Sequence, residues 1–214
     1  MKFNVYPCAN PNAMKRFLAL TLFTLSLFTL QAQSSVEVLA WVTWSDGTTT
    51  DEDIYVELDP PGSTTISFGT TQQKLAYIKD DMRKYITPRE VQRIEFEFSD
   101  RDFVLISTYA AGSTLLMNCV IDNKLRVLHY YPSLSNGEDI FFETNDMTWN
   151  VLSIEGENQG NNARVVRLGF RKNMMELFKS YPEMHEKVKK REYTYDNWEQ
   201  MVDYFNATYG ATDL

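Results

Sequence analysis

Histidine and cysteine are scarce in this chain, whose 214 residues include two of each. Zinc sites usually take three or four ligands from cysteine, histidine and acidic residues, so this scarcity disfavours a zinc centre. His185 lies in "PEMHEKVKK", which lacks the His-Glu-x-x-His spacing of zinc hydrolases. The sequence therefore predicts no metal ligand among its histidines.

Several catalytic and cofactor motifs are also missing. The chain has no glycine-rich phosphate loop, no Gly-x-Ser-x-Gly nucleophile elbow and no dinucleotide fingerprint. The acidic run 51–53 lacks the Asp-x-Asp-x-Asp-Gly spacing that wraps oxygen ligands around calcium, which favours a solvated hairpin. We therefore predict no cofactor, no metal site and no assignable catalytic residue.

Basic residues are outnumbered, with 21 Lys and Arg against 29 Asp and Glu. Lys2, Lys15 and Arg16 are the only charged residues before Ser34, so the chain from Ser34 onward carries 18 basic and 29 acidic residues, a formal net charge of −11. Such a surface repels phosphate backbones and anionic lipid headgroups. The charge balance excludes nucleic acid as an expected partner.

Only one long apolar run is present, at 17–30, after the positive pair Lys15 and Arg16. Leu30-Gln31-Ala32 then offers a small residue at a cleavage position, which is the layout of a secretory signal peptide over 14–33. The run is shorter than the roughly 20 residues needed to cross a bilayer, although an uncleaved anchor is the alternative. We expect a periplasmic or extracellular protein with no stable membrane insertion after cleavage.

The residues before this segment, 1–13, contain two prolines and three asparagines and show no periodicity. We interpret them as an upstream extension of the gene, with translation starting at Met14; a genuinely extended leader is the alternative. Removal of this segment takes Cys8 away and leaves Cys119 alone, so no internal disulfide is expected.

The remaining chain is rich in strand patterns and then in helical patterns. Apolar and alternating stretches at 36–44, 53–58, 64–68, 74–79, 92–98, 102–109, 113–122, 124–131 and 140–154 predict an antiparallel β domain over 34–155. Thr87 and Glu90 have the form of a capping box, which predicts one short helical turn before the strand at 92–98. A polar linker is expected at 156–164.

From 165 to 214 the apolar period changes from two to about 3.6, which predicts about three helices packed on the β domain. Pro182 should end the first helix and start the second, and Asp196 with Glu199 should cap the third. The apolar faces are Phe170, Met174, Leu177, Phe178 and Tyr181 on the first helix, and Trp198, Met201, Val202, Phe205 and Tyr209 on the third. The predicted fold is thus α+β, an antiparallel sheet or barrel-like part followed by helices.

Cys119 and His129 lie on neighbouring predicted strands, so a Cys-His nucleophile is conceivable. A two-residue turn at Asp122-Asn123 would put Cys119 opposite Arg126 and turn His129 to the other face. A three-residue turn would put both on one apolar face, where the thiol is unreactive because burial raises its pKa. Either register favours a structural thiol.

Aromatic side chains are the better candidates for binding. Trp41 and Trp44 are three residues apart in a predicted strand and should face opposite sides, Tyr131 alternates with Tyr130, and Trp149 stands near a loop. We predict Trp41, Trp44, Tyr131 and Trp149 as ligand-binding residues for a glycan or protein partner, with packing in the core as the alternative.

Four stretches of the chain resemble a group of uncharacterised exported proteins of Gram-negative bacteria: "TTISF", "KYITPREVQRIEFEF", "DFVLISTYAAGSTLLM" and "LFKSYPEMHEKVKKREYTYDNWEQMVDYFNATY". The similarity covers roughly 41–209 and includes the first turn, Asp46-Gly47-Thr48. The tail differs slightly, since it has Phe205-Asn206 where the group ends near Tyr-Asn. The resemblance implies export and a strand-rich half followed by a helical tail, and it implies no catalytic residue.

Two functions from different classes remain open at this point. The first is a non-enzymatic binding or structural module of the cell envelope. The second is a hydrolase, for example acting on glycans, that uses acids drawn from Glu95, Glu97, Asp100 and Asp102. Paired carboxylates roughly 5 to 10 Å apart in a cleft would be its mark.

Overall fold

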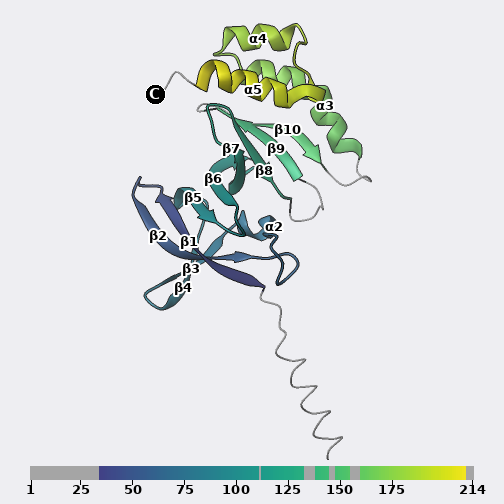
Figure 1. Ribbon diagram of the computed structural model, residues 1–214. Helices are drawn as coiled ribbons and strands as arrows, with labels where there is room; N and C mark the ends of the chain where they lie inside the picture. The colour runs from purple at the N-terminus through teal and green to yellow at the C-terminus, as the bar shows by residue number, and fades with distance from the viewer. Residues whose placement is uncertain (1–33, 111, 133–137, 145–147, 155–159, 211–214) are drawn as a thin grey trace, which may run out of the picture. The chain divides into compact units, whose positions relative to one another are not determined.

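The computed structural model describes residues 34–110, 112–132, 138–144, 148–154 and 160–210. The predicted upstream extension (1–13) and signal peptide (14–33) lie outside these residues. From Ser34 onward the chain forms one compact unit (Figure 1). In the described part of the chain, no helix has both the length and the apolar composition needed to span a membrane.

Ten strands of the described residues form one antiparallel sheet, which is not closed into a barrel. Its spatial order is β10-β9-β8-β7-β6-β5-β1-β2-β3-β4. The strands are β1 (Ser35–Trp44), β2 (Thr49–Glu57), β3 (Leu75–Lys79), β4 (Met82–Ile86), β5 (Val91–Glu97), β6 (Asp102–Ala110), β7 (Ser113–Ile121), β8 (Arg126–Tyr130), β9 (Glu138–Glu143) and β10 (Thr148–Ile154). Together with the C-terminal helices this confirms the predicted α+β class.

Strand β1 lies inside the sheet because it pairs with β2 on one side and β5 on the other. The β1–β2 turn is the predicted Asp46-Gly47-Thr48, in which Gly47 has φ +87° and the Asp46 carboxylate accepts from the Thr48 N–H at 2.9 Å. A positive φ is easily reached by glycine, which explains the residue at this position. Strand β4 and its pairing with β3 were not expected from the sequence.

One face of β1–β7 carries a large apolar core. Its members are Ala40, Val42, Ile54, Val56, Ile66, Leu75, Tyr77, Ile86, Val91, Ile94, Phe96, Leu105 and Leu116. The short helix α2 (Phe68–Thr71) lies between β2 and β3 in the chain, and the strand predicted at 64–68 is reduced to one bridge between Leu58 and Ile66. Thr87 and Glu90 make only half of the predicted capping box: the Thr87 N–H and hydroxyl both donate to the Glu90 carboxylate at 2.7 Å, but the Glu90 N–H donates to the Thr87 backbone carbonyl at 3.0 Å. They close a hydrogen-bonded turn and not a helix.

The C-terminal helices are α3 (Gly160–Leu177), α4 (Pro182–Lys189) and α5 (Trp198–Tyr209), preceded by a 3₁₀ turn η1 (Tyr195–Asn197). Helix α3 begins inside the segment predicted as a linker (156–164). Most residues of the predicted apolar faces are buried: Phe170, Met174, Phe178, Met201 and Phe205 are at most 3% exposed. They form one core with Val127 of β8 and Phe142 of β9, so the helices cover that face of the sheet (Figure 1). The predicted members Tyr181, Trp198 and Tyr209 are only partly buried and pack against this core.

The prediction that Asp196 and Glu199 cap the last helix is wrong. The capping residue is Thr194, two residues before Asp196. Its N–H and hydroxyl donate to the Asn197 side-chain oxygen at 2.6 and 3.0 Å. Asparagine at this position replaces the acidic partner of an ordinary capping box. The 3₁₀ turn between the two residues shifts the helix start, which periodicity alone does not reveal.

The opposite face of β6–β9 carries a third apolar cluster: Ile106, Ala110, Leu115, Met117, Cys119, Leu128 and Phe141. This face is enclosed because the sheet curls, so that β10 approaches β6. The Thr108 hydroxyl of β6 donates to the Glu143 carboxylate of β9, although β7 and β8 separate the two strands in the sheet. Curvature thus buries both faces at this end.

Candidate functional site

The sheet forks where strand β3 leaves strand β2. Ile54 and Tyr55 of β2 pair with Tyr77 and Ala76 of β3. Beyond this point β2 has another partner: Leu58 bridges Ile66, and the Ser67 N–H donates to the Glu57 carbonyl at 2.7 Å. A cavity of about 940 Å³, here called the fork cavity, lies between the two branches and is lined by Tyr55, Glu57, Asp59, Thr65, Ile66, Ser67, Phe68, Gly69, Thr70, Thr71, Gln73, Lys74, Leu75, Ala76, Arg83, Tyr85, Tyr131 and Pro132.

The floor of the fork cavity is held by a buried amide. Gln72 follows α2 and is 2% exposed. Its side chain donates to the carbonyl of Tyr131 and accepts from the Tyr131 N–H at 3.0 Å, and its own carbonyl accepts from the Leu116 N–H at 2.9 Å. Buried polar groups are tolerated when they are fully hydrogen-bonded, and a satisfied network fixes its surroundings. Gln72 therefore fixes α2 against β7 and the end of β8.

Tyr131, one of the predicted binding residues, forms part of the wall of this cavity. Its ring stacks on Phe68, with centroids 4.9 Å apart and planes 15° from parallel. Phe68 in turn contacts Phe103 at 5.9 Å. The pair forms an aromatic wall of the cavity in which Tyr131 is held by Phe68, and Phe68 by Phe103.

A row of three side chains crosses the strands on the other side of the fork cavity. Tyr55, Ala76 and Tyr85 are directly paired across β2, β3 and β4. Ala76 is small, and the slot that it leaves between the two tyrosines is occupied: Ala76 is 6% exposed, and the Arg83 guanidinium lies 5.9 and 5.8 Å from the two ring centroids. The Lys74 ammonium lies 4.8 Å from the Tyr85 ring. Such cation–π contacts hold both cations in place at the rim.

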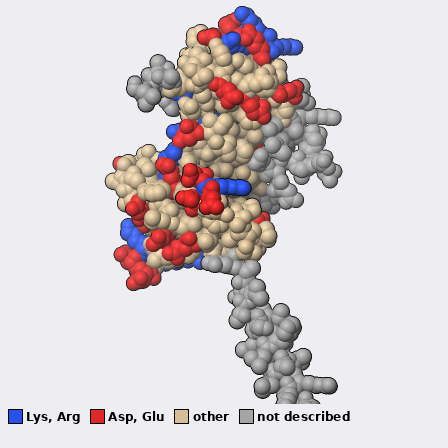
Figure 2. Space-filling model, viewed as in Figure 1, with Lys and Arg blue, Asp and Glu red and all other residues tan. Residues whose placement is uncertain are grey.

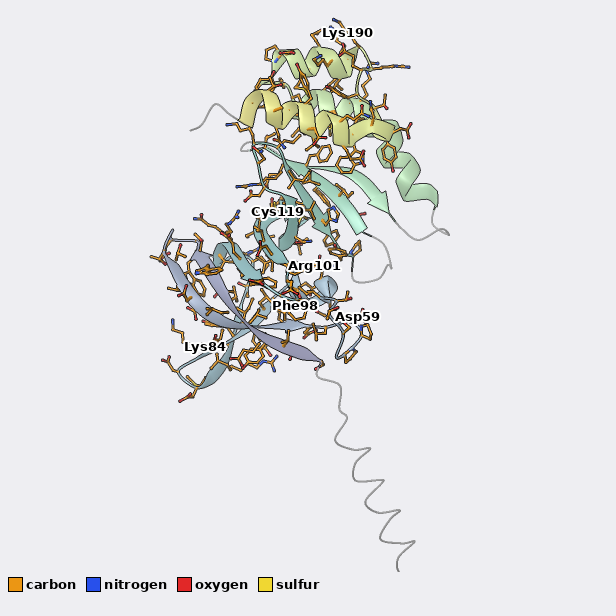
Figure 3. All side chains as sticks on the ribbon, viewed as in Figure 1. Asp59, Lys84, Phe98, Arg101, Cys119 and Lys190 are labelled. Carbon is orange, nitrogen blue, oxygen red and sulfur yellow. The ribbon has the colours of Figure 1, made fainter. Side chains whose placement is uncertain are left out.

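Charges of both signs surround these rings. The Tyr55 hydroxyl donates to Glu37 at 2.7 Å, and this hydrogen bond raises the pKa of Tyr55. Glu57 and Asp59 add carboxylates to the lining; Asp59 is labelled near α2 in Figure 3. Rings, hydrogen-bonding carboxylates and fixed cations in one concavity are the composition of a site for a polar ligand that carries a ring.

The other predicted binding residues lie elsewhere. Trp41 is 53% exposed on β1, next to Leu39 at 54%, on the opposite sheet face from the β1–β7 core. Its cross-strand neighbours are the acidic residues Asp51 and Glu95. Trp44 is half-buried on the core side: its Nε1 donates to Thr50 at 2.7 Å and its ring lies 6.2 Å from Tyr77.

Trp149 lies on β10 opposite Phe142, and its side chain is outside the described part. The structure therefore does not bring Trp41, Trp44 and Tyr131 together into one patch. Sequence reasoning missed Phe68, Lys74, Arg83 and Tyr85. The alternation in "DIYVEL" could have set Tyr55 apart from the core, but its partners depend on the unexpected strand β4.

The Cys-His alternative fails on geometry. Asn118 is opposite His129 and Cys119 is opposite Leu128, so the thiol and the imidazole belong to opposite faces. Both predicted registers are wrong because a β-bulge between Cys119 and Ile121 shifts the pairing. Burial, followed by the nearby Asp122 carboxylate, raises the pKa of Cys119 to about 12, which keeps the thiol protonated and unreactive.

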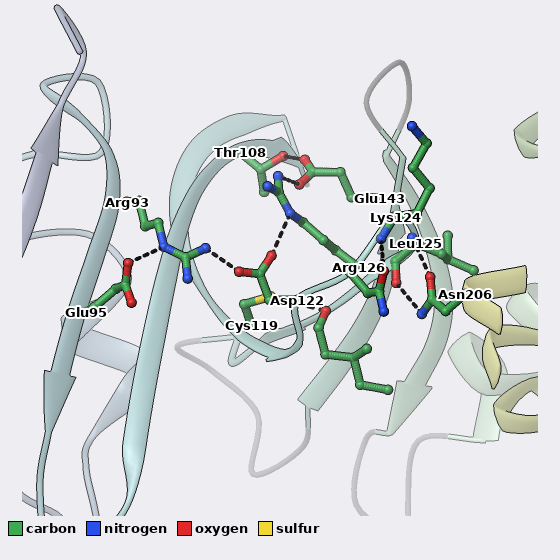
Figure 4. Close-up of polar contacts among 12 residues, drawn as sticks. Arg93, Glu95, Thr108, Cys119, Asp122, Lys124, Leu125, Arg126, Glu143 and Asn206 are labelled. Carbon is green, nitrogen blue, oxygen red and sulfur yellow. Dashed lines mark hydrogen bonds and ion pairs between the residues drawn. The ribbon is translucent and has the colours of Figure 1, made fainter. Parts of the chain in front are cut away.

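A chain of charges crosses the sheet near Cys119 (Figure 4). Arg93 binds Glu95 at 2.6 Å and also Asp122, and Asp122 accepts from Arg126 at 3.0 Å. Arg126 continues the chain to Glu143 at 3.3 Å. Burial alone would raise the pKa of Asp122, but hydrogen bonds from the two arginines outweigh it and lower the pKa. This network joins β5, β7, β8 and β9 and is structural.

The acids of the hydrolase alternative are not gathered in a described cavity. Glu95 is engaged by Arg93, and Glu97 is paired with Asp102 across β5 and β6 on an exposed part of the sheet. None of these, nor Asp100, lines the fork cavity. In the part of the chain that the structure describes, no three Asp, Glu, His or Cys side chains are grouped so that they could hold a metal ion.

Comparisons with known proteins give no further guide. The chain matches no family model, no curated protein and no solved structure. The fork cavity is therefore the feature of the molecule that best indicates a function.

Proposed function

We propose that this protein is an exported, non-enzymatic binding module of the cell envelope, and that the fork cavity takes a glycan. The observation that carries the proposal is the Tyr55–Ala76–Tyr85 row with Arg83 between the two rings, facing the stacked Phe68 and Tyr131. Tyrosine and phenylalanine rings offer flat apolar surfaces to the C–H face of a sugar ring.

The polar groups of the fork cavity suit the hydroxyl groups of a sugar. Carboxylates such as Glu57 and Asp59 accept hydrogen bonds, and Arg83 and Lys74 donate them. Hydrogen bonds to charged groups are about twice as strong as neutral ones, so a few of them can orient a neutral ligand. Because cavity and side chains are held by Gln72 and by the cation–π contacts, little ordering is needed on binding.

Binding can be tested with a panel of neutral oligosaccharides and isothermal titration calorimetry, using the chain from Ser34 onward. Arg83→Ala and Tyr85→Ala should each weaken binding about tenfold, the effect of losing one charge-assisted hydrogen bond or one ring contact. Ala76→Leu should displace Arg83 from between the tyrosines and weaken binding, with some loss of stability because Ala76 is buried. Lys84→Ala is the matched control, because Lys84 is on the same strand with its side chain on the opposite face (Figure 3).

If all four variants bound the oligosaccharides as tightly as the unsubstituted protein does, the fork cavity would not be the binding site. The hydrolase alternative is examined in the same samples: release of reducing sugar by the protein, abolished by Glu57→Gln or Asp59→Asn, would contradict the non-enzymatic assignment. These two acids are the carboxylates that line the cavity beside the rings.

Export is supported by the segment 14–33, which has the layout of a signal peptide, and by the resemblance of 41–209 to exported proteins of Gram-negative bacteria. We expect the exported protein to begin at Gln33 or Ser34, and a gene that starts at Met14 to export equally well. Mass spectrometry of the exported protein checks this. Detection of residues 1–13 on the mature protein would show that the leader is not removed as proposed.

A further inference from the structure

The helical layer contains a second cavity, of about 760 Å³, between α3, α4 and the segment 191–196. It is called the helical cavity here. Lysine and arginine outnumber acids in its wall: Arg171, Lys172, Lys179 and Arg191 stand against Glu176 and Asp196. This balance is the reverse of that of the whole chain, whose formal net charge is −8. Figure 2 shows basic and acidic side chains close together at the helical end of the molecule.

Three of these cations have no side-chain partner within the described part of the chain. The side chains of Arg171, Lys172 and Arg191 make no hydrogen bond or ion pair with any described residue, whereas Lys179 is 3.5 Å from Glu176. All three side chains are exposed and line the same cavity, so each adds to the positive potential there. An anion would be attracted to the helical cavity by this potential.

Arg191 occupies a backbone position that suits glycine. Its N–H donates to the carbonyl of Val188, and the next N–H, of Glu192, donates to that of Lys187, both at 3.0 Å. This is the Schellman ending of a helix, and Arg191 takes its left-handed position with φ +64°. A non-glycine residue is strained there, and strain that persists in a structure points to a use for the side chain.

The segment 191–196, which forms one wall of the helical cavity, is held by hydrogen bonds with the Asn197 side chain and by packing on Phe170. The Asn197 side chain receives hydrogen bonds from Thr194 and donates one to the Glu192 carbonyl at 3.1 Å. Tyr195 meets Phe170 edge to face, with centroids 6.2 Å apart. Phe170 is 3% exposed and joins the helical core. The site therefore combines a rigid aromatic side with a cationic rim, and it is formed before any ligand arrives.

We propose that the helical cavity binds a small organic anion that carries a ring, with its phosphate or carboxylate group at Arg191, Arg171 and Lys172 and its ring beside Tyr193 and Tyr195. Arg191 is then a binding residue, and its strained backbone is retained for its side chain. This inference is independent of the glycan proposal, because the fork cavity shares no residue with the helical cavity.

Phenyl phosphate is a suitable probe, since it joins one ring to one phosphate group. Isothermal titration calorimetry at low salt should detect its binding to the chain from Ser34 onward, and benzyl alcohol, which is neutral, should bind at least tenfold more weakly. Affinity should fall as salt is raised from 50 to 300 mM, as expected for partly exposed charges.

Arg191→Gly separates ligand recognition from folding. Glycine relieves the strained position, so the melting temperature should rise by about 2 °C, while the affinity for phenyl phosphate should fall about tenfold. The matched control is Lys190→Gln, which removes the neighbouring charge from a residue outside the cavity lining (Figure 3). It should change neither measurement. Arg171→Gln combined with Lys172→Gln should also weaken binding.

Two results would overturn the proposal. One is unchanged affinity for phenyl phosphate in both Arg191→Gly and the Arg171/Lys172 double variant. The other is binding of benzyl alcohol as tight as that of phenyl phosphate, which would make the site merely apolar. Failure of oligosaccharide binding would leave these results unaffected, because that experiment concerns the fork cavity.

Discussion

The same face of the sheet is exposed at one end and buried at the other. Following the strand pairing, Trp41 of β1 shares a face with Met117 of β7 and Phe141 of β9. Trp41 is 53% exposed, whereas Met117 and Phe141 are at most 5% exposed. The difference arises because the sheet curls at β6–β10 and encloses this face, while nothing among the described residues covers it at β1. An alternating strand thus defines a face without defining whether that face is covered.

The largest effect is expected where the helices cover the opposite face. Phe205 is fully buried between Phe178 at 5.1 Å and Tyr181 at 4.7 Å. Phe205→Ala should lower the free energy of unfolding by about 3–5 kcal/mol, because it leaves a cavity in the core shared by helices and sheet. Urea unfolding followed by circular dichroism measures the change. A loss under about 1 kcal/mol would mean that the helices do not depend on this core.

A smaller loss is expected from the contact that ties α5 to the sheet. The Asn206 side chain accepts from the Leu125 N–H at 2.8 Å and donates to the Leu125 carbonyl at 3.1 Å (Figure 4). Leu125 is fully buried, so Asn206→Ala leaves two polar groups without a partner and should cost about 2–3 kcal/mol. Asn206→Asp keeps the acceptor and should cost less. If both variants were as stable as the unsubstituted protein in urea unfolding, the hydrogen bonds between Asn206 and Leu125 would not contribute to stability.

The charge network should contribute less than either of these. Asp122→Asn removes the carboxylate between Arg93 and Arg126 and should cost about 1 kcal/mol at neutral pH, because the pairs are partly exposed. The pKa of Asp122 is lowered in the folded state, so its contribution is complete above the ordinary value of 3.8 and is lost as pH falls through the lowered pKa. Melting curves of the protein and the variant should therefore converge at strongly acidic pH. A gap that persists there would assign the effect to packing.

The smallest effect on stability is expected on the exposed end of the same face. Trp41→Ser should change the free energy of unfolding by less than about 0.5 kcal/mol, as for other surface substitutions. Thermal melting provides the measurement, with Phe205→Ala as the reference for a covered position. A loss above about 2 kcal/mol would show that a further segment or a partner covers Trp41 in solution.

Much of the fold follows from local patterns. The alternation in "QRIEFEF" defined a strand whose Ile94 and Phe96 are buried, and the helical spacing of Met201, Val202 and Phe205 defined a buried stripe. These predictions succeeded because burial of one face imposes a period of two on strands and 3.6 on helices. The capping at Thr194 and Asn197 was missed because a 3₁₀ turn displaced the helix start.

The candidate site was predictable only in part. Tyr131, which was predicted to bind a ligand, lines the fork cavity, whereas Trp44 lies beside Tyr77 on the core side of the sheet. The sequence could not predict the slot at Ala76, because the slot depends on the pairing of β2 with β3 and of β3 with β4. Arg191 was overlooked since nothing local marks an arginine at a left-handed helix end.

The sequence by itself determined the class of fold, the buried stripes of the helices, the antiparallel strands and the excess of acidic charge, because each depends on neighbouring residues or on composition. Tertiary structure alone decided the strand order that places β1 between β2 and β5, the bulge that separates Cys119 from His129, and the two cavities. The physical reason is that register and curvature are set by the packing of distant segments. A one-residue shift in register turns every side chain of a strand to the other face.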